Sequence, residues 1–327
     1  NIPAGRYPGA VNVDPHGLDL TRLAAYLEDQ GLTRGPLTAE LITGGKSNLT
    51  YVVRDATAEY VVRRPPLGHV LATAHDMGRE YRVMTALRDT PVPVPRTYHL
   101  CTDPEVIGAP FYVMEHVAGE RPPMTPALAH ELIDVLAALH SIPPESVGLA
   151  DFGRPDGYLE RQVRRWKKQL DASRSRDIPG IDELFQRLSR DIPRSGAPAI
   201  VHGDFKLGNT LIAGGKVRAV LDWEMSTLGD PLTDLALFLL YGDEAIDLDS
   251  EEKGEMANPE EIVAHYAEAT GRDVSRLGWY LGLACFKLAV IAEGIHFRYT
   301  QGLTVGEGFA EIGEHVGRLV ARGLTEV

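Results

Sequence analysis

Cysteine is scarce in this chain of 327 residues, which contains only Cys101 and Cys285. Two cysteines cannot build a disulfide framework, and neither lies in a cluster with the spacing of metal ligands. Proteins without disulfides are typical of reducing compartments, so we expect a cytoplasmic protein.

Long apolar runs are also missing. The most apolar stretch, residues 279–292, is interrupted by Lys287 and is followed by Glu293, whereas a membrane-spanning helix needs about 20 mostly apolar residues. The first 30 residues show no basic start followed by an apolar core, so they do not resemble a signal peptide. The sequence therefore predicts no membrane partner.

The chain also has no excess of basic residues. The chain has 46 Asp and Glu against 33 Lys and Arg, which gives a formal net charge of −13. This balance argues against a general nucleic-acid binder, because binding to a phosphate backbone needs a basic face. It leaves nucleotides open as ligands, since one metal ion and a few local donors can hold a triphosphate. Apolar residues at 44% and charged residues at 24% are typical of a folded globular protein.

The first third of the chain is rich in expected strands. Residues 19–31 carry leucines at helical spacing and predict a short helix. Runs of β-prone residues separated by turn formers predict a three-strand meander over 39–63. The complete set of elements expected here is a helix at 19–31, strands at 39–43, 49–55 and 59–63, a helix at about 75–88, and strands at 91–100 and 110–117.

The rest of the chain is mostly helical. A strand-rich part followed by a helical part indicates an α+β fold. We expect a smaller first domain over residues 1–117, a helical second domain over 118–327, a hinge at about 114–119 and a cleft between the two domains. Within the second domain, a compact β segment at 199–222 is expected among helices at 126–141, 158–173, 181–190, 232–241, 259–270, about 275–300 and 306–323.

The stretch from 202 to 222 carries the strongest chemical signal. Two apolar runs with a Gly-Gly turn between them predict a β-hairpin. Asn209 comes just before its first strand and Asp222 just after its second, so the hairpin brings both side chains to its open end, roughly 5 Å apart. Paired oxygen ligands of this kind suit Mg²⁺. Asp204 lies one loop earlier, where it can accept a proton from a hydroxyl nucleophile.

These residues resemble a known family. The pattern H-x-D-x-x-x-x-N, followed by a hairpin and a metal-binding Asp, resembles the catalytic loop of the protein-kinase-like fold. The stretches HGDFKLGN at 202–209 and VLDWE at 220–224 resemble the aminoglycoside phosphotransferase and choline kinase branch. The later GDP at 229–231 and DLA at 234–236 match it too. The resemblance covers roughly residues 35–300 and is closest to the subgroup fused to acyl-CoA dehydrogenases in animals.

The resemblance implies a two-lobe fold and a small-molecule kinase. A small strand-rich N-lobe and a larger helical C-lobe would bind ATP or GTP with Mg²⁺, and the γ-phosphoryl would pass to a hydroxyl of a small molecule. Asp204 would be the catalytic base, and Asn209 with Asp222 would hold the metal. Lys206 either neutralises charge on the transferred phosphoryl or is a surface lysine of the loop. His202, Asp230 and Asp234 would support the loop.

The turn at 44–48 is the expected phosphate-covering loop. Its sequence Gly44-Gly45-Lys46-Ser47-Asn48 contains a GKS triplet, but a Walker A motif also needs a glycine five positions before Gly45, where the chain has Glu40. A helix should also follow, whereas LTYVV predicts a strand. We therefore interpret the turn as a hairpin loop whose backbone N–H groups and Ser47 face the triphosphate, although a plain hairpin turn explains it equally well.

Arg63 is expected to hold nucleotide phosphates. It shares a strand face with Val61 and occupies the place where the kinase fold has a lysine. Glu80 borders the buried stripe of the following helix and is the expected ion-pair partner. Arg64 would compete if a bulge shifted the register. Backbone groups near Glu115 and Val117 are expected to bind the base of the nucleotide.

The acceptor is less well defined. Glu224, Glu293, His296 and Arg298 are candidate acceptor contacts. A basic segment at 154–176 and an acidic one at 243–261 point to opposite acceptor charges, and solvated surfaces explain both. An aminoglycoside, a choline-like amino alcohol, a sugar and a hydroxyacyl thioester all stay open, with the subgroup favouring a hydroxyacyl or other metabolite. The alternatives to a kinase are a nucleotide-binding module without turnover and a metal-dependent phosphate-ester hydrolase.

Overall fold

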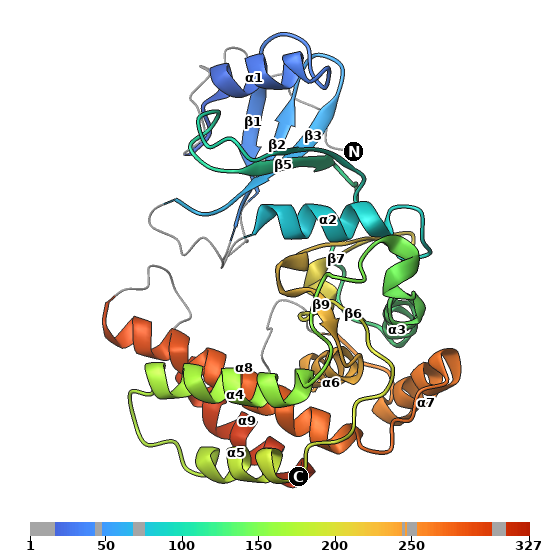
Figure 1. Cartoon of the computed structure of the whole chain (residues 1–327), viewed down its shortest axis with the longest axis vertical. Coiled ribbons are helices and arrows are strands. Elements are labelled where there is room, and N and C mark those ends of the chain that lie inside the picture. Colours follow the sequence, from blue (N-terminus) through green and yellow to red (C-terminus); the bar gives the residue numbers. More distant parts are fainter. Residues whose placement is uncertain (1–16, 43–47, 68–75, 244–245, 247–253, 303–311) are drawn as a thin grey trace. The chain divides into compact units, whose positions relative to one another are not determined.

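The computed structural model describes residues 17–42, 48–67, 76–243, 246, 254–302 and 312–327. The chain divides into two compact units (Figure 1). The first unit comprises residues 1–85 and 95–117, and the second comprises residues 86–94 and 118–327.

The first unit is built on an antiparallel sheet. Its strands are β1 (Thr38–Leu41), β2 (Leu49–Arg54), β3 (Glu59–Arg64), β4 (Thr97–Cys101) and β5 (Phe111–Glu115), and they lie in the order β1-β2-β3-β5-β4. The predicted meander of the first three strands is confirmed. The strand expected over 91–100 begins only at Thr97, because the prolines at 91, 93 and 95 have no N–H group for a sheet.

Two helices accompany this sheet, α1 (Leu20–Asp29) and α2 (Met77–Leu87). Leu23 and Leu27 of α1 belong to one buried core with Tyr51, Val53 and Val62 of the sheet. Because side chains alternate along a strand, the neighbours of Val62 in β3 point to the opposite face. Arg63 and Arg64 are therefore expected on different faces of the same strand.

The second unit is mainly helical. Its helices are α3 (Pro126–Ser141), α4 (Tyr158–Ser173), α5 (Ile181–Arg190), α6 (Leu232–Tyr241), α7 (Pro259–Thr270), α8 (Leu277–Thr300) and α9 (Ile312–Glu326). The bounds predicted for the helices α3 to α7 are confirmed. The helix expected from 275 begins two residues later, and the last helix extends to Glu326.

Two short β pairs lie among these helices. The predicted hairpin is present as β7 (Thr210–Ala213) and β8 (Lys216–Val220). Gly214 and Gly215 both adopt positive φ angles, 60° and 74°, which is what a tight hairpin turn requires and what glycine tolerates. The second pair, β6 (Ala199–Val201) with β9 (Thr227–Gly229), includes a strand that the sequence did not predict.

Helix α8 is the central element of the second unit and packs against α4, α5, α6 and α9 (Figure 1). By length and composition alone it could cross a membrane, but 67% of its most apolar window is buried inside the structure. A core helix has the same composition, and the packing on four neighbours accounts for it.

A buried polar network ties three of these helices together. His140 of α3 lies between Tyr266 of α7 and Asp234 of α6, with 2.7 Å from Nδ1 to the Tyr266 hydroxyl and 3.3 Å from Nε2 to the Asp234 carboxylate. Since a carboxylate only accepts, Nε2 carries the proton. Burial lowers the pKa of His140, although the hydrogen bond and charge of Asp234 oppose this. The folded protein therefore holds this ring neutral until the pH is lower than an exposed histidine needs.

This network predicts a pH dependence of stability. As the pH falls through about 6.5, the ordinary histidine pKa, His140 takes up a proton in the unfolded chain before it does so in the folded one, so the free energy of unfolding decreases. The measurement is urea unfolding between pH 7.5 and 5.5. In His140→Gln the slope should be smaller by up to about 1.4 kcal/mol per pH unit. Equal slopes in the two proteins would contradict the assignment.

Candidate active site

The loop of residues 202–209 joins β6 to β7, and Asp234 holds its first residues. The carboxylate of Asp234 accepts the His202 N–H at 2.6 Å and the Gly203 N–H at 2.8 Å. Gly203 has a φ of +87°, and a Cβ there would lie 2.7 Å from the carbonyl oxygen of Met225. Only glycine fits this position, so the HGD sequence is a backbone requirement as much as a chemical one.

The His202 ring is hydrogen-bonded to two backbone groups. Its Nε2 lies 2.9 Å from the carbonyl oxygen of Leu221, and its Nδ1 accepts the Asp204 N–H at 3.2 Å. A carbonyl only accepts and an amide only donates, so the ring is protonated at Nε2. The ring also lies 4.7 Å from the Trp223 ring, between centroids. Both nitrogens are thus occupied by backbone groups, which supports a structural role for His202.

The carboxylate of Asp204 is held by two side chains. Its Oδ1 accepts the hydroxyl of Tyr241 at 2.7 Å, and its Oδ2 accepts Nδ2 of Asn209 at 3.0 Å. Burial raises the pKa of Asp204, but the charges of Lys287 and Lys206 and the Tyr241 hydrogen bond lower it more, so the pKa lies below its ordinary value. The carboxylate is therefore charged at neutral pH and fixed in direction, as an acceptor for a hydroxyl proton must be.

Asn209 and Asp222 lie at the open end of the hairpin. The Leu221 N–H donates to the carbonyl oxygen of Asn209 at 2.8 Å, which continues the pairing of Thr210 with Val220. Nδ2 of Asn209 donates to Asp204, so its amide oxygen is the atom suited to a cation. Asp222 has φ 64° and is the one non-glycine residue with positive φ in the described parts of the chain. Backbone strain of this kind is common at functional sites.

An amide oxygen and a carboxylate are hard ligands of the kind that Mg²⁺ takes, with water and phosphate completing its shell. The donor set therefore fits the predicted metal. Among the residues that the structure describes, no group of three or more His, Cys, Asp or Glu side chains forms an alternative metal site.

The remaining predicted residues of this loop region have clear positions. Lys206 is partly buried, with Nζ 4.7 Å from the centroid of the Tyr241 ring. Glu224 is partly exposed in the short 3₁₀ helix Trp223–Met225 that follows Asp222. Asp230 is buried and accepts the Leu232 N–H and the Tyr280 hydroxyl, at 3.1 and 2.9 Å. It therefore binds the first N–H of α6 and ties this helix to α8.

In the first unit, Arg63 and Glu80 form a buried ion pair. Nε of Arg63 lies 3.2 Å from Oε2 of Glu80, and the two side chains are 13% and 1% exposed. Glu80 also accepts Nδ2 of Asn48 at 3.1 Å and the hydroxyl of Tyr112 at 3.0 Å. These donors replace the water that the carboxylate loses on burial. Asn48, at the end of the predicted phosphate loop, is thereby joined to the ion pair.

Arg64 lies on the other face of β3. Its Nη1 donates to the carbonyl oxygens of Gly17 and Ile107, at 2.5 and 2.8 Å, and the residue is 4% exposed. These are contacts of the protein interior. Of the two arginines, Arg63 is the one that lies with Glu80, as the regular register of β3 predicts.

The structure describes only some of the other predicted nucleotide contacts. Gly44, Gly45, Lys46 and Ser47 lie outside the described residues. The N–H of Glu115 donates to the Arg96 carbonyl at 2.8 Å, so this group is used within the first unit. Base contacts near Glu115 and Val117 stay a prediction.

Glu293, His296 and Arg298 differ in exposure along α8. Glu293 is fully buried, and its carboxylate accepts hydrogen bonds from the amide and hydroxyl of Ser175 and from Nε of Arg176, at 2.8 to 3.1 Å. Its contacts favour a role in fixing the chain before α5. His296 is partly buried beside Gly313, and Arg298 is exposed.

The basic segment at 154–176 is partly committed to internal contacts. Arg161 donates to two backbone carbonyls, Lys167 pairs with Asp171, Arg174 pairs with Asp182, and Arg176 pairs with Glu293. At least four of its eight cationic side chains are therefore occupied within the second unit, which weakens the case for a single anion-binding face.

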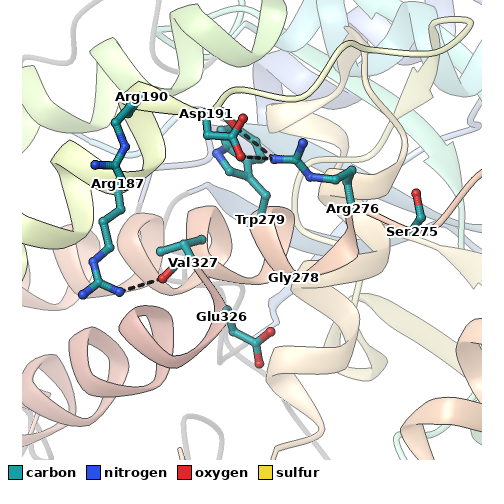
Figure 2. A pocket seen from close by; sticks show the side chains of 9 residues that line it. All are labelled: Arg187, Arg190, Asp191, Ser275, Arg276, Gly278, Trp279, Glu326 and Val327. Carbon is teal, nitrogen blue, oxygen red and sulfur yellow. Dashed lines mark hydrogen bonds and ion pairs between the residues drawn. The ribbon is translucent and has the colours of Figure 1, made fainter.

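A pocket of about 320 Å³ lies elsewhere in the second unit, at the ends of α5, α8 and α9 (Figure 2). Arg276 pairs with Asp191 at 2.7 Å, and Arg187 donates to the carbonyl oxygen of Val327 at 2.7 Å. Figure 2 shows both contacts within the pocket wall. The residues that line it include none of those predicted for the site.

Sequence reasoning missed several residues that touch the predicted site residues, including three that contact the catalytic loop or Glu80. Tyr112 contacts Glu80, Tyr241 contacts Asp204, and Lys287 donates to the carbonyl oxygen of Gly203. Tyr241 ends α6, whose first turn contains Asp234, so the matching DLA motif offered an indirect signal. For Lys287 the sequence offered one signal, a cationic residue within an apolar helix.

The chain is similar to known proteins in sequence and in fold. Residues 38–280 match the model of the phosphotransferase enzyme family. Acyl-CoA dehydrogenase family member 11 of Gallus gallus is 37% identical over 313 residues, which are 89% of this chain and 40% of that protein. The chain thus spans about two fifths of the length of this relative.

Solved structures extend the likeness to the fold. A candidate aminoglycoside phosphotransferase from Ralstonia eutropha JMP134 has a TM-score of 0.82 at 31% identity, with 94% of this chain and 98% of that one covered. A spectinomycin phosphotransferase in complex with ADP and spectinomycin has a TM-score of 0.63 at 15% identity, with 94% and 98% covered. The expected α+β, protein-kinase-like fold is thereby confirmed. Together with the family match over residues 38–280, this shows that the chain belongs to the phosphotransferase enzyme family.

Proposed function

We propose that this protein is an ATP- and Mg²⁺-dependent kinase of a small hydroxylated molecule. The observation that carries the proposal is the carboxylate of Asp204, which Tyr241 and Asn209 fix at 2.7 and 3.0 Å beside the open end of the hairpin. A charged acceptor for a hydroxyl proton next to a pair of oxygen ligands is what phosphoryl transfer to an alcohol needs.

In the proposed reaction, the hydroxyl oxygen of the acceptor forms a bond to the γ-phosphorus. The bond from that phosphorus to the β,γ-bridging oxygen breaks, so ADP leaves. The proton of the hydroxyl passes to the Asp204 carboxylate. Asp204 has a lowered pKa and is a weak base, so its main task is to orient the hydroxyl, and positioning supplies most of the acceleration.

Asn209 and Asp222 would hold Mg²⁺ through the amide oxygen and the carboxylate. The ion supplies charge neutralisation on the phosphates when it is bound. Lys206 adds a positive charge on the same loop. Arg63, paired with Glu80 at 3.2 Å, would bind phosphate oxygens through its guanidinium group, whose planar geometry suits phosphate.

For the acceptor we favour the hydroxyl of an acyl thioester or a related metabolite. The support is the 37% identity to a protein named as an acyl-CoA dehydrogenase family member, of which this chain matches 40%. The test is an ATP-consumption assay over a panel of hydroxyacyl-CoA thioesters, choline, aminoglycosides and sugars. Phosphorylation of a hydroxyacyl-CoA supports the choice, whereas selective turnover of an antibiotic or an amino alcohol contradicts it.

The metal assignment predicts that Asp222→Ala loses Mg²⁺-dependent nucleotide binding. The variant lacks the carboxylate and keeps only the Asn209 oxygen, so Mg·ATP loses one of two protein ligands. Isothermal calorimetry with Mg·ATP measures the effect. Asp171→Ala, which removes an exposed carboxylate of α4, is the control and should bind as the wild type does. Unchanged affinity in Asp222→Ala would falsify the metal site.

The base assignment predicts a different pattern for Asp204→Asn. The amide cannot accept the hydroxyl proton, so turnover should fall by about 10²-fold or more. Affinity for Mg·ATP should stay within a few fold, because the ligands Asn209 and Asp222 are retained. Steady-state kinetics and calorimetry on one preparation give both values. Turnover at the wild-type level would remove Asp204 from the mechanism.

The two neighbouring arginines provide a matched pair. Arg63→Ala removes charge-assisted hydrogen bonds to phosphate, each worth about 1.5–3 kcal/mol, so Mg·ATP affinity should fall by about tenfold or more. Arg64→Ala removes interior contacts with Gly17 and Ile107, so it should lower the melting temperature and leave affinity nearly unchanged. The opposite pattern would assign the phosphate contact to Arg64.

A further inference from the structure

Lys287 is an unusual residue for its place in the fold. It lies on α8 between Phe286 and Leu288, which are 0% and 7% exposed. Its own side chain is partly buried, and its Nζ donates to the carbonyl oxygen of Gly203 at 2.6 Å. A cation in an apolar helix of the core is costly unless it is paired or hydrogen-bonded. The catalytic loop supplies that hydrogen bond.

The hydrogen bond holds one particular peptide group. The carbonyl of Gly203 and the N–H of Asp204 belong to the same peptide plane. Lys287 holds the carbonyl side at 2.6 Å, and Nδ1 of His202 accepts from the N–H side at 3.2 Å. The peptide group between Gly203 and Asp204 is therefore hydrogen-bonded through both its carbonyl and its N–H.

Gly203 makes the orientation of this peptide group dependent on such hydrogen bonds. With φ at +87° and no Cβ, glycine allows its flanking peptide groups to rotate at little steric cost. Asp234 fixes the preceding N–H at 2.8 Å, but it does not touch the carbonyl. Without Lys287, the Gly203 carbonyl would lose a charged donor, and the direction of the Asp204 side chain would be less defined.

The surroundings of Lys287 fit this task. Helices α4 and α8 pack together, and Nζ lies 5.8 Å from the centroid of the Trp166 ring of α4 (Figure 1). Trp166 is 3% exposed, so the ammonium is backed by a fixed aromatic surface. Burial lowers the pKa of Lys287, while the charges of Asp204 and Asp234 oppose this.

We propose that Lys287 is a positioning residue of the phosphoryl transfer: its ammonium fixes the Gly203–Asp204 peptide and thereby aims the Asp204 carboxylate at the acceptor hydroxyl. This inference rests on the proposed function. Lys287 acts through the loop, so its loss should affect turnover and leave nucleotide binding intact.

The test compares Lys287→Met with the wild type in two measurements. The first is Mg²⁺-dependent release of phosphate from ATP without an acceptor, in which water takes the place of the hydroxyl. The second is the Kd of Mg·ATP by calorimetry. We expect turnover to fall by about tenfold or more, as for other residues that position a catalytic group, with Kd changed by less than about twofold. Lys167→Met, which removes a partly buried lysine of α4 beside Phe185, is the control and should keep both values.

A chemical rescue separates the ammonium from the packing. Lys287→Cys is alkylated with 2-bromoethylamine, which restores a side chain of lysine length that ends in an ammonium. The native Cys101 and Cys285 are 1% and 0% exposed, and burial raises the pKa of Cys285 to about 12, so both are poor nucleophiles in the folded protein. We expect turnover to return in the alkylated Lys287→Cys variant and not in treated Lys287→Met.

The outcomes separate this inference from the proposed function. Wild-type turnover in Lys287→Met overturns the inference and leaves the function standing. A parallel loss of Mg·ATP affinity makes Lys287 a phosphate ligand, which also overturns it. Failure of the rescue in a folded Lys287→Cys variant that mass spectrometry shows to be alkylated at position 287 assigns the loss to packing and overturns it too. A wild-type protein without any Mg²⁺-dependent phosphate release overturns the proposed function, and the inference falls with it.

Discussion

A buried carboxylate holds the catalytic loop in place. Asp234 is 1% exposed and accepts the N–H groups of His202 and Gly203, while His140 contacts it from α3. Burial raises the pKa of Asp234, but hydrogen bonds from His140 and from the His202 amide help to lower it below its ordinary value. The carboxylate stays charged because donors replace its lost water. The start of the loop is therefore fixed to α6, and the position of Asp204 follows from it.

In the first unit, the position of the phosphate-binding candidate Arg63 depends on the alternation of side chains along β3. Arg63 and Arg64 are neighbours in sequence, yet one lies against Glu80 and the other against the carbonyls of Gly17 and Ile107. A shift of one residue in β3 would exchange them. The register is held because Val62 belongs to the apolar core that covers the other face of the sheet. Hydrophobic burial thus determines which guanidinium lies beside Glu80.

The sequence allowed good prediction wherever the cause is local. Periodic apolar residues gave the bounds of α3 to α7, and the Gly-Gly turn gave the hairpin that carries Asn209 and Asp222. The strand β9 was missed, because three residues have no periodicity and are held only by pairing with β6. Tyr241 and Lys287 were missed as partners of the catalytic loop for a similar reason. Each residue contacts the loop from a position tens of residues away in the sequence. A short sequence motif does not show such a contact.

The electrostatics of the site are likewise decided by neighbours and not by the net charge. The chain carries −13, yet Asp204 has a lowered pKa because Lys287 and Lys206 lie near it. Charges farther away than about 8–10 Å are largely screened by salt, whereas close, partly buried ones are not. A carboxylate stabilised in this way is a poor proton acceptor until a bond to the hydroxyl oxygen begins to form. Phosphoryl transfer tolerates this, since its loose transition state needs a well-placed nucleophile more than a strong base. The geometry that holds Asp204 therefore matters more to the proposed reaction than its basicity.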